Sequence, residues 1–218
     1  MKTEELTQAI QQGDVPKVAS LLDEDPSLLK ARFGNTSAIL FAIYHGRQAI
    51  AQLFVERGVE LTFAEACALG ERRRALELLN KDPSLLKSYS ADGYPAFALA
   101  IFFRHPDLAQ ELIGRGADVD AAARNPQRVA PLHAAAAVGD HATMRLLLEK
   151  GANPNPRQEA GFTPFHSAAN HGDIEMAKLL IQHGADPRAK TDDGRDAIAI
   201  AEKNNQPAFV EWFRANIH

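Results

Sequence analysis

The stretch AGFTPFHSAANHGDIEMAKLLIQHGADPRA, Ala160–Ala189, contains two helical patterns separated by one glycine, Gly172. The residues before Gly172 are small and alanine-rich, which favours a short helix that packs closely against a neighbour. The residues after it place apolar side chains at Ile174, Leu180 and Ile181, near the 3.6-residue period of an amphipathic helix. Such a pair of short helices cannot bury its own apolar face, so the pattern predicts a unit that stacks on copies of itself.

The same arrangement recurs along the chain at intervals close to 33 residues. The segment VAPLHAAAAVGDHATMRLLLEKGANPNP, Val129–Pro156, places Gly139 33 residues before Gly172. Steps of similar length lead to seven turn positions, defined as the residue between the two helices of a unit: Gly13, Gly46, Gly70, Arg104, Gly139, Gly172 and Asn205. Six of the seven are followed, eight and nine residues later, by an apolar pair. A period of this length is typical of a solenoid.

Two kinds of helix terminator are expected after the second helix of a unit. Four units carry glycine twelve residues after the turn position, at Gly58, Gly116, Gly151 and Gly184. Glycine can adopt the left-handed conformation that ends a helix. In the first and third units this position is Asp25 and Asp82, each the start of the repeated word DPSLLK. There the proline stops the helix, and the aspartate is predicted to cap a fresh helical turn.

The units resemble the ankyrin repeat family. Ala160–Ala189 matches the family pattern closely, Val129–Pro156 is nearly as good, and DGYPAFALAIFFRHPDLAQELIGRGADVDA, Asp92–Ala121, keeps the frame without the His and the turn glycine. The resemblance covers essentially the whole chain. It implies one all-α domain, a solenoid of about seven stacked helix–loop–helix repeats with short β-hairpin loops. The repeats are expected at about residues 1–30, 31–61, 62–87, 88–120, 121–155, 156–188 and 189–218.

Repeat three departs from this frame. The spacing of 24 residues between Gly46 and Gly70 removes about nine residues between Gly58 and Ala66, which is roughly the hairpin. We therefore predict that repeat three lacks its hairpin and that the row of hairpins has a gap there. Repeat five carries two extra residues near ARNPQR, so its hairpin should be longer.

The composition narrows the possible compartments and partners. The 218 residues carry a net charge of −4 and one cysteine, Cys67, which permits no internal disulfide. No secretory h-region and no membrane-length apolar run occurs, so a cytoplasmic protein without membrane contact is expected. Nucleic acid is disfavoured as a partner because phosphate binding needs a basic face. The basic cluster ERRRALE, Glu71–Glu77, predicts a solvated helix start, with contact to an acidic partner as the alternative. A monomer is expected, although the sequence leaves the oligomeric state open.

Residue types that often carry chemistry occur without a supporting arrangement. His133 and His166 could act near neutral pH, but the ankyrin resemblance implies that they are structural and bond to neighbouring backbone. The histidines near Asp140 and Asp173 lack the spacing of a metal site. Cys67 lies in a small, alanine-rich helix, where a free cysteine is usually a core residue. We therefore expect no catalytic residue, no cofactor and no metal.

The resemblance implies a partner surface made of hairpin positions and of the residues just before each turn position. The predicted partner-binding residues are Phe33, Tyr44, His45, Tyr89, Tyr94, Phe102, Phe103, Arg128, Arg157, Phe162, Asn170, His171, Lys190 and Arg195. The same frame includes Asp92, Gln127 and Glu159. We hypothesise a concave groove with Tyr44, Tyr94, Phe102 and Phe103 at its centre and a more basic flank. Alternatively, Phe102 or Phe103 fills the space left by the missing hairpin.

The predicted function is a non-catalytic protein–protein interaction module that binds a partner protein on its concave surface. A dedicated inhibitor or regulatory subunit of one enzyme is the alternative. A small hydrolase built on the repeat scaffold is a third possibility, but no convergent spacing of His, Asp or Glu supports it.

Overall fold

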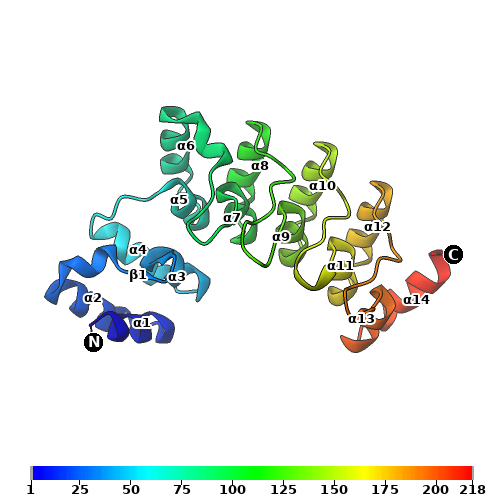
Figure 1. Ribbon diagram of the computed structural model, residues 1–218, viewed down its shortest axis with the longest axis horizontal. Helices are drawn as coiled ribbons and strands as arrows, with labels where there is room; N and C mark the ends of the chain where they lie inside the picture. The colour runs from blue at the N-terminus through cyan, green and yellow to red at the C-terminus, as the bar shows by residue number, and fades with distance from the viewer. Residues whose placement is uncertain (1, 218) are drawn as a thin grey trace.

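The computed structural model describes residues 2–217, which form seven pairs of α-helices stacked into an arc (Figure 1). The pairs are α1 (Lys2–Gln12) with α2 (Val15–Glu24), α3 (Ala38–Tyr44) with α4 (Gln48–Glu56), α5 (Phe63–Leu69) with α6 (Arg72–Lys81), α7 (Ala96–Phe102) with α8 (Pro106–Gly114), α9 (Pro131–Val138) with α10 (His141–Glu149), α11 (Pro164–His171) with α12 (Ile174–Gln182), and α13 (Ala197–Lys203) with α14 (Pro207–Asn216). The helices α6, α8, α10 and α12 stand along the outer edge of the arc (Figure 1). The predicted solenoid of helix–loop–helix repeats is confirmed.

One hydrophobic core runs through all seven pairs, from Leu6 in α1 to Phe213 in α14. The first helices contribute small, fully buried side chains such as Ala66, Ala100 and Ala168. Because these side chains are short, the first helices of successive repeats approach one another closely, and interiors packed in this way leave little void. Each repeat therefore buries its apolar face only against its neighbours.

All seven turn positions have the left-handed backbone conformation. The φ angles are 77° at Gly13, 68° at Gly46, 73° at Gly70, 63° at Arg104, 68° at Gly139, 68° at Gly172 and 55° at Asn205. The two positions without glycine therefore adopt the same turn as the other five, although a side chain in this region carries a cost of about 1–2 kcal/mol. The register predicted from the sequence is confirmed at both.

The residue after a turn position links its own repeat to the preceding one in three cases. There the side chain donates a hydrogen bond to a carbonyl oxygen at the end of the preceding repeat's first helix. The three bonds are Arg47 Nη2 to Gln11 O (2.6 Å), His105 Nε2 to Ala68 O (2.9 Å) and Gln206 Nε2 to Asn170 O (3.3 Å). Carbonyls at a helix end have no partner within the helix, so these donors satisfy them.

In three other repeats the corresponding residue is aspartate, and its carboxylate caps its own second helix. The accepting and donating groups are Asp14 Oδ1 with Lys17 N, Asp140 Oδ1 with Thr143 N, and Asp173 Oδ1 with Met176 N, each at 2.9 Å. An aspartate at this position therefore stabilises the start of its own second helix. Asp173 also reaches the preceding repeat, because its Oδ2 lies 2.6 Å from Nε2 of His141.

Some turn positions need glycine for space as well as for conformation. They are the ones approached by a side chain from the following repeat. A Cβ atom at Gly70 would lie 2.3 Å from Nδ1 of His105, whereas a Cβ atom at Gly139 would meet nothing within 4 Å. Arg104 is followed one repeat later by Asp140, which caps its own helix and donates nothing toward Arg104. A side chain at position 104 is therefore accommodated.

The word DPSLLK acts as the predicted helix terminator in both copies. The backbone N–H of Asp25 closes α2 on the Leu21 carbonyl, and the Asp25 carboxylate accepts a bond of 3.1 Å from the N–H of Ser27. The 3-10 helix η1 (Pro26–Lys30) follows. The second copy forms the 3-10 helix η2 (Pro83–Lys87) with the same cap by Asp82 on Ser84, at 3.0 Å.

His133 and His166 are structural, as the resemblance implied. Nδ1 of His133 accepts the N–H of Ala130 (3.2 Å), so the ring proton is assigned to Nε2, which donates to the carbonyl of Phe162 in the next repeat (3.1 Å). His166 makes the same pair of bonds, to the N–H of Thr163 and the carbonyl of Ala189, both at 3.0 Å. Each histidine therefore fastens a helix start to the following hairpin.

Backbone hydrogen bonds join the hairpin tips of repeats four to seven into one row. Their donors and acceptors are Arg124 N to Gly93 O (2.8 Å), Glu159 N to Gln127 O (2.9 Å) and Asp192 N to Ala160 O (2.9 Å). Within the described chain, η3 (Glu159–Gly161) is the only helical turn in this row, and repeat five follows an irregular path around its two extra residues. Each tip in this row is therefore hydrogen-bonded to the next.

The row is interrupted at repeat three. Repeat two has its own hairpin, in which β1 (Arg32–Phe33) pairs antiparallel with β2 (Thr36–Ser37). From Gly58 the chain passes directly to Thr62, the N-cap of α5, with no strand between α4 and α5 in this described segment. The predicted absence of the third hairpin is confirmed.

A buried carboxylate occupies the place of the histidine in repeat three. Glu65 is 5 % exposed, and its Oε2 accepts bonds from the backbone N–H and the hydroxyl of Thr62, at 2.8 and 2.7 Å. Its Oε1 accepts the hydroxyl of Ser37 in repeat two, at 2.6 Å. Because a carboxylate only accepts, Glu65 bonds back to repeat two instead of donating forward to a hairpin.

The glycine contacts lead to a first prediction. Gly139→Ala should lower the free energy of unfolding by about 1–2 kcal/mol, the cost of a Cβ atom in a left-handed turn. Gly70→Ala should cost about 1–3 kcal/mol more, because the new Cβ displaces His105. Urea denaturation of the two variants, followed by circular dichroism, measures the difference. Equal losses would contradict the proposed contact with His105.

The burial of His133 predicts a pH-dependent stability. Burial lowers the pKa of His133 from 6.5 to about 4. The unfolded chain therefore binds more protons than the folded chain between these values, and stability falls as the pH drops from 6.5 toward 4, by at most about 1.4 kcal/mol per pH unit for this group. Urea midpoints at pH 7, 6 and 5 should show a shallower slope for His133→Gln than for the wild type.

The exposed His183, at the end of α12, provides the control for this measurement. His183→Gln should keep the wild-type slope. If His133→Gln also keeps it, the ring of His133 is not the group that resists protonation.

Candidate protein-binding groove

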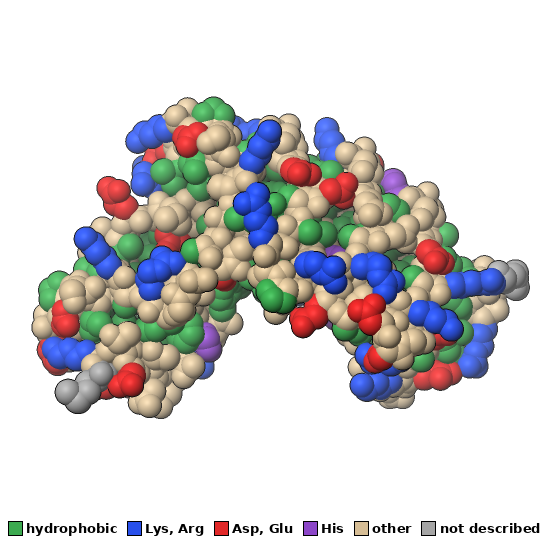
Figure 2. All heavy atoms as spheres, in the orientation of Figure 1, with side chains coloured by type: hydrophobic (Ala, Val, Ile, Leu, Met, Phe, Trp, Pro, Cys, Tyr) green, Lys and Arg blue, Asp and Glu red, His purple; other side chains and the backbone are tan. Residues whose placement is uncertain are grey.

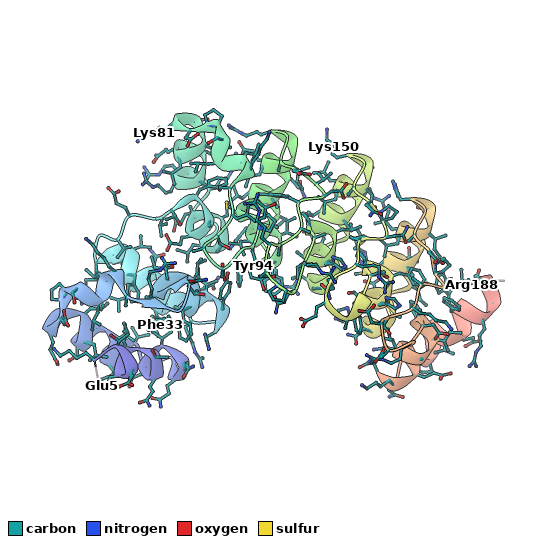
Figure 3. The ribbon with its side chains drawn as sticks, in the orientation of Figure 1. Glu5, Phe33, Lys81, Tyr94, Lys150 and Arg188 are labelled. Carbon is teal, nitrogen blue, oxygen red and sulfur yellow. The ribbon has the colours of Figure 1, made fainter. Side chains whose placement is uncertain are left out.

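A groove of about 1030 Å³ lies on the hairpin side of the arc. Its walls come from repeats two, four, five and six, and no described residue of repeat three lines it. Thr36 and Tyr44 of repeat two face Asp92 and Tyr94 of repeat four directly across the groove's end. Figure 3 shows Tyr94 in the middle of the arc, beside the hollow that the space-filling view shows between the two ends (Figures 2 and 3).

Aromatic rings from repeats two and four meet at this end of the groove. The ring of Tyr44 stacks on Phe103 at 5.7 Å between centroids and meets Tyr94 edge-on at 6.4 Å. Phe102 meets Phe103 edge-on at 5.2 Å. Residues of repeat two thus touch residues of repeat four, past repeat three, because no third hairpin separates them.

Phe102 and Phe103 differ in how much of each ring is exposed. The sequence left open whether each ring lines the groove or fills the gap left by the missing hairpin. Phe103 is half-buried and packs against the core. Phe102 is 47 % exposed and Tyr44 is 36 % exposed; among the described residues they are the only large hydrophobic side chains at the surface. Phe102 therefore lines the groove and Phe103 packs behind it, and their part in partner binding stays a prediction.

Hydrogen bonds hold the tyrosines and Asp92 in place. The N–H of Tyr94 donates to the Ser90 hydroxyl oxygen at 3.0 Å, and the Ser90 hydroxyl donates to the carboxylate of Asp92. The hydroxyl of Tyr94 donates to the side-chain oxygen of Gln127. Burial, followed by the neighbouring Asp92 carboxylate, raises the pKa of Tyr44, and burial raises the pKa of Tyr94. Both hydroxyls are therefore protonated at neutral pH.

The groove is acidic. Asp92 and Glu159 line it, and none of the described lining residues is Lys, Arg or His. The basic flank expected from the sequence concerns residues beside this lining, and some of them are paired with acids. Arg157 pairs with Asp192 at 2.8 Å.

Arg195 lies farther along, and its guanidinium is 5.5 Å from the centroid of the Phe162 ring. Its Nε pairs with Asp193 at 2.8 Å, and hydrogen bonds from Arg195 and Thr191 lower the pKa of Asp193 to about 2. Arg128 and Lys190 are exposed, and neither lines the groove. The basic residues of repeats five to seven therefore lie around the groove rather than in it.

The structure brings together five of the predicted partner-binding residues. Tyr44, Tyr94, Phe102 and Phe162 line the groove, and Phe103 packs behind them. The sequence frame did not include Asn125, whose side-chain amide donates to the carbonyl of Asp92 at 3.0 Å. The Asn-Pro dipeptide at Asn125, a common turn signal, could have pointed to it.

The other predicted residues lie outside the groove lining. Phe33 packs on the ring of Phe41 at 4.5 Å, and Phe41 also contacts His45 at 4.2 Å. Tyr89 lies under the guanidinium of Arg124, at 3.7 Å. Asn170 and His171 are exposed at the end of α11.

Groups that could support other chemistry are not arranged for it. Cys67 is buried, and burial raises the pKa of its thiol, which disfavours the reactive thiolate. His141 pairs with Asp173 at 2.6 Å, but in residues 2–217 no three His, Cys, Asp or Glu side chains converge as a metal site would require. None of the helices in this range combines the length and apolar character needed to cross a bilayer.

The fold and the groove define a helical repeat protein with a preformed concave surface. The family model of ankyrin repeats (3 copies) matches residues 63–158 and 132–217, which together cover more than half of the chain. The chain belongs to the ankyrin repeat family. Ankyrin repeats generally mediate protein–protein interactions, and the scaffold is typically non-catalytic.

A relative in Treponema pallidum (strain Nichols) is named an ankyrin repeat-containing protein. It is 38 % identical over 73 residues, which are 34 % of this chain and 24 % of the relative. The chain thus matches about a quarter of the length of that protein. The similarity supports membership of the ankyrin repeat family, and the name of the relative does not identify a binding partner.

Proposed function

We propose that this protein binds a partner protein in the groove between repeats two and six, without catalytic chemistry of its own. The observation that carries the proposal is the exposure of Tyr44 and Phe102 at the groove wall. Exposed aromatic side chains in a concave site, held by packed neighbours, are typical anchors of protein interfaces.

The rigidity of the site supports this proposal. The hairpin tips of repeats four to six are bonded to one another, and Tyr94 and Asp92 are held by Ser90 and Gln127. A surface that is already ordered loses little conformational entropy when a partner binds. The groove can therefore use most of its contact energy for affinity.

A hydrolase built on this scaffold has no support from the groove. Its described lining contains no Ser, Cys, His or Lys, and therefore none of the Ser–His or Cys–His pairs that activate the common nucleophiles of hydrolases. A dedicated inhibitor or regulatory subunit would use the same surface with one tight partner. The expectations of a cytoplasmic monomer that does not bind nucleic acid remain predictions.

Affinity capture from the native cell, followed by quantitative mass spectrometry, tests the proposal. Phe102→Ala should reduce the recovery of the specific partner by about tenfold or more, because the side chain is an exposed anchor. Its urea midpoint should stay close to that of the wild type.

Arg73→Ala is the control, since Arg73 lies on the outer helix α6 and contacts Glu77 at 3.9 Å. It should keep the wild-type recovery. Equal recovery by wild type and Phe102→Ala would contradict binding in the groove. One dominant captured species would favour the dedicated inhibitor or regulatory subunit, and several species would favour a general interaction module.

A further inference from the structure

We infer that the groove recognises a positively charged side chain, Arg or Lys, carried by an otherwise uncharged segment of the partner. This inference rests on the proposed function and adds the chemistry of the partner. Three features of the groove support it: its carboxylates without an ion pair, its tyrosine rings without a bound cation and its apolar remainder.

The first feature is uncompensated negative charge. Asp92 accepts a hydrogen bond from Ser90, which is neutral, and Glu159 contributes its backbone N–H to Gln127. Among the described residues neither carboxylate forms an ion pair, although Arg157 and Arg195 each do so with an aspartate farther along the arc. A cation that entered the groove would therefore meet two acids that form no ion pair with the described residues.

The second feature is the set of aromatic faces near Asp92. Elsewhere in this protein the same kind of ring already holds a guanidinium: Arg124 lies 3.7 Å from the centroid of Tyr89, and Arg195 lies 5.5 Å from that of Phe162. Within residues 2–217 the rings of Tyr44 and Tyr94 have no such cation. A tyrosine ring attracts a cation through its negative face, and a nearby carboxylate adds to that attraction.

The third feature is the chemistry of the remaining wall. Pro95, Leu99, Val129 and Phe162 give the groove apolar surface, and its volume of about 1030 Å³ exceeds that of one side chain. A partner segment with several charges would leave some of them against this apolar wall, which is costly. One basic side chain between uncharged neighbours matches both parts of the groove. An acidic segment or a nucleic acid would instead face Asp92 and Glu159 with like charge.

Two synthetic peptides provide the probe. Acetyl-Ala-Leu-Arg-Leu-Ala-amide carries the cation, and the same peptide with citrulline in place of arginine keeps the shape without the charge. Each is titrated into the full ¹⁵N-labelled chain, and the amide signals are followed by NMR. The arginine peptide should shift signals at Asp92–Tyr94 and Gln127, with an affinity about tenfold higher than that of the citrulline peptide. Added salt should weaken it.

Glu159→Gln should reduce the difference between the two peptides, and Asp92→Asn should reduce it further. Asp92→Asn also removes the acceptor of the Ser90 hydroxyl, so Glu159→Gln, an exposed residue, is the variant that keeps the hairpin intact. Glu149→Gln, on the exposed side of the outer helix α10, should leave both affinities unchanged.

Equal binding of the two peptides in the groove would overturn recognition of the cation while leaving the groove as a peptide-binding site. Binding of the arginine peptide outside the groove, or of neither peptide, would also overturn it. The proposed function does not depend on these outcomes, because capture of a partner by the wild type but not by Phe102→Ala decides it separately.

Discussion

The structure depends on the stacking of one helix pair upon the next. No pair in this chain has a core of its own, and the buried alanines of the first helices bring neighbouring repeats close enough to share one. The left-handed turn positions keep the two helices of each pair antiparallel, and the donors Arg47, His105 and Gln206 tie three of those turns to the following repeat. The groove is built on this frame, since Leu99 and Ala134 of the core line it and Tyr94 and Phe162 pack against the core.

Repeat three has the helix pair of the other repeats but lacks the hairpin. It keeps both helices and its turn glycine. Its buried Glu65 accepts a hydrogen bond from Ser37 of the preceding repeat, whereas the histidines of repeats five and six donate to the following repeat. Without the hairpin, repeat two comes into contact with repeat four, and Tyr44 stacks on Phe103. The row of hairpins is therefore interrupted at repeat three, and the groove has aromatic rings at that end.

Much of the frame could be predicted from the sequence because it depends on local rules that recur every 33 residues. The turn positions Arg104 and Asn205 followed from register alone, and the caps at Asp25 and Asp82 followed from the chemistry of Asp-Pro. The aromatic residues of the groove were also predicted, because Phe102 stands where a polar side chain is usual.

The sign of the charge in the groove could not be predicted in this way. Counting basic residues in repeats five to seven predicted a basic flank but gave no charge for the groove lining itself, where Asp92 and Glu159 lie. Beside the lining, Arg157 and Arg195 form ion pairs with Asp192 and Asp193. Such pairing depends on how neighbouring hairpins lie in space, which no short window of sequence contains. The sequence also could not show that Phe102 is exposed while Phe103 is half-buried. Adjacent residues at the end of a helix point in different directions, and what each one meets depends on the neighbouring repeats.

The central claim is that repeats two and four touch because repeat three has no hairpin, and ring-to-ring contacts in solution test it most directly. A two-dimensional NOE spectrum of the full chain should show cross-peaks between the ring protons of Tyr44 and those of Phe103, whose centroids lie 5.7 Å apart. Replacing Val59–Leu61 with the hairpin sequence Ala185–Arg195 should keep the helices folded and abolish those cross-peaks. Their absence in the wild type, or their persistence after the hairpin is restored, would contradict the account.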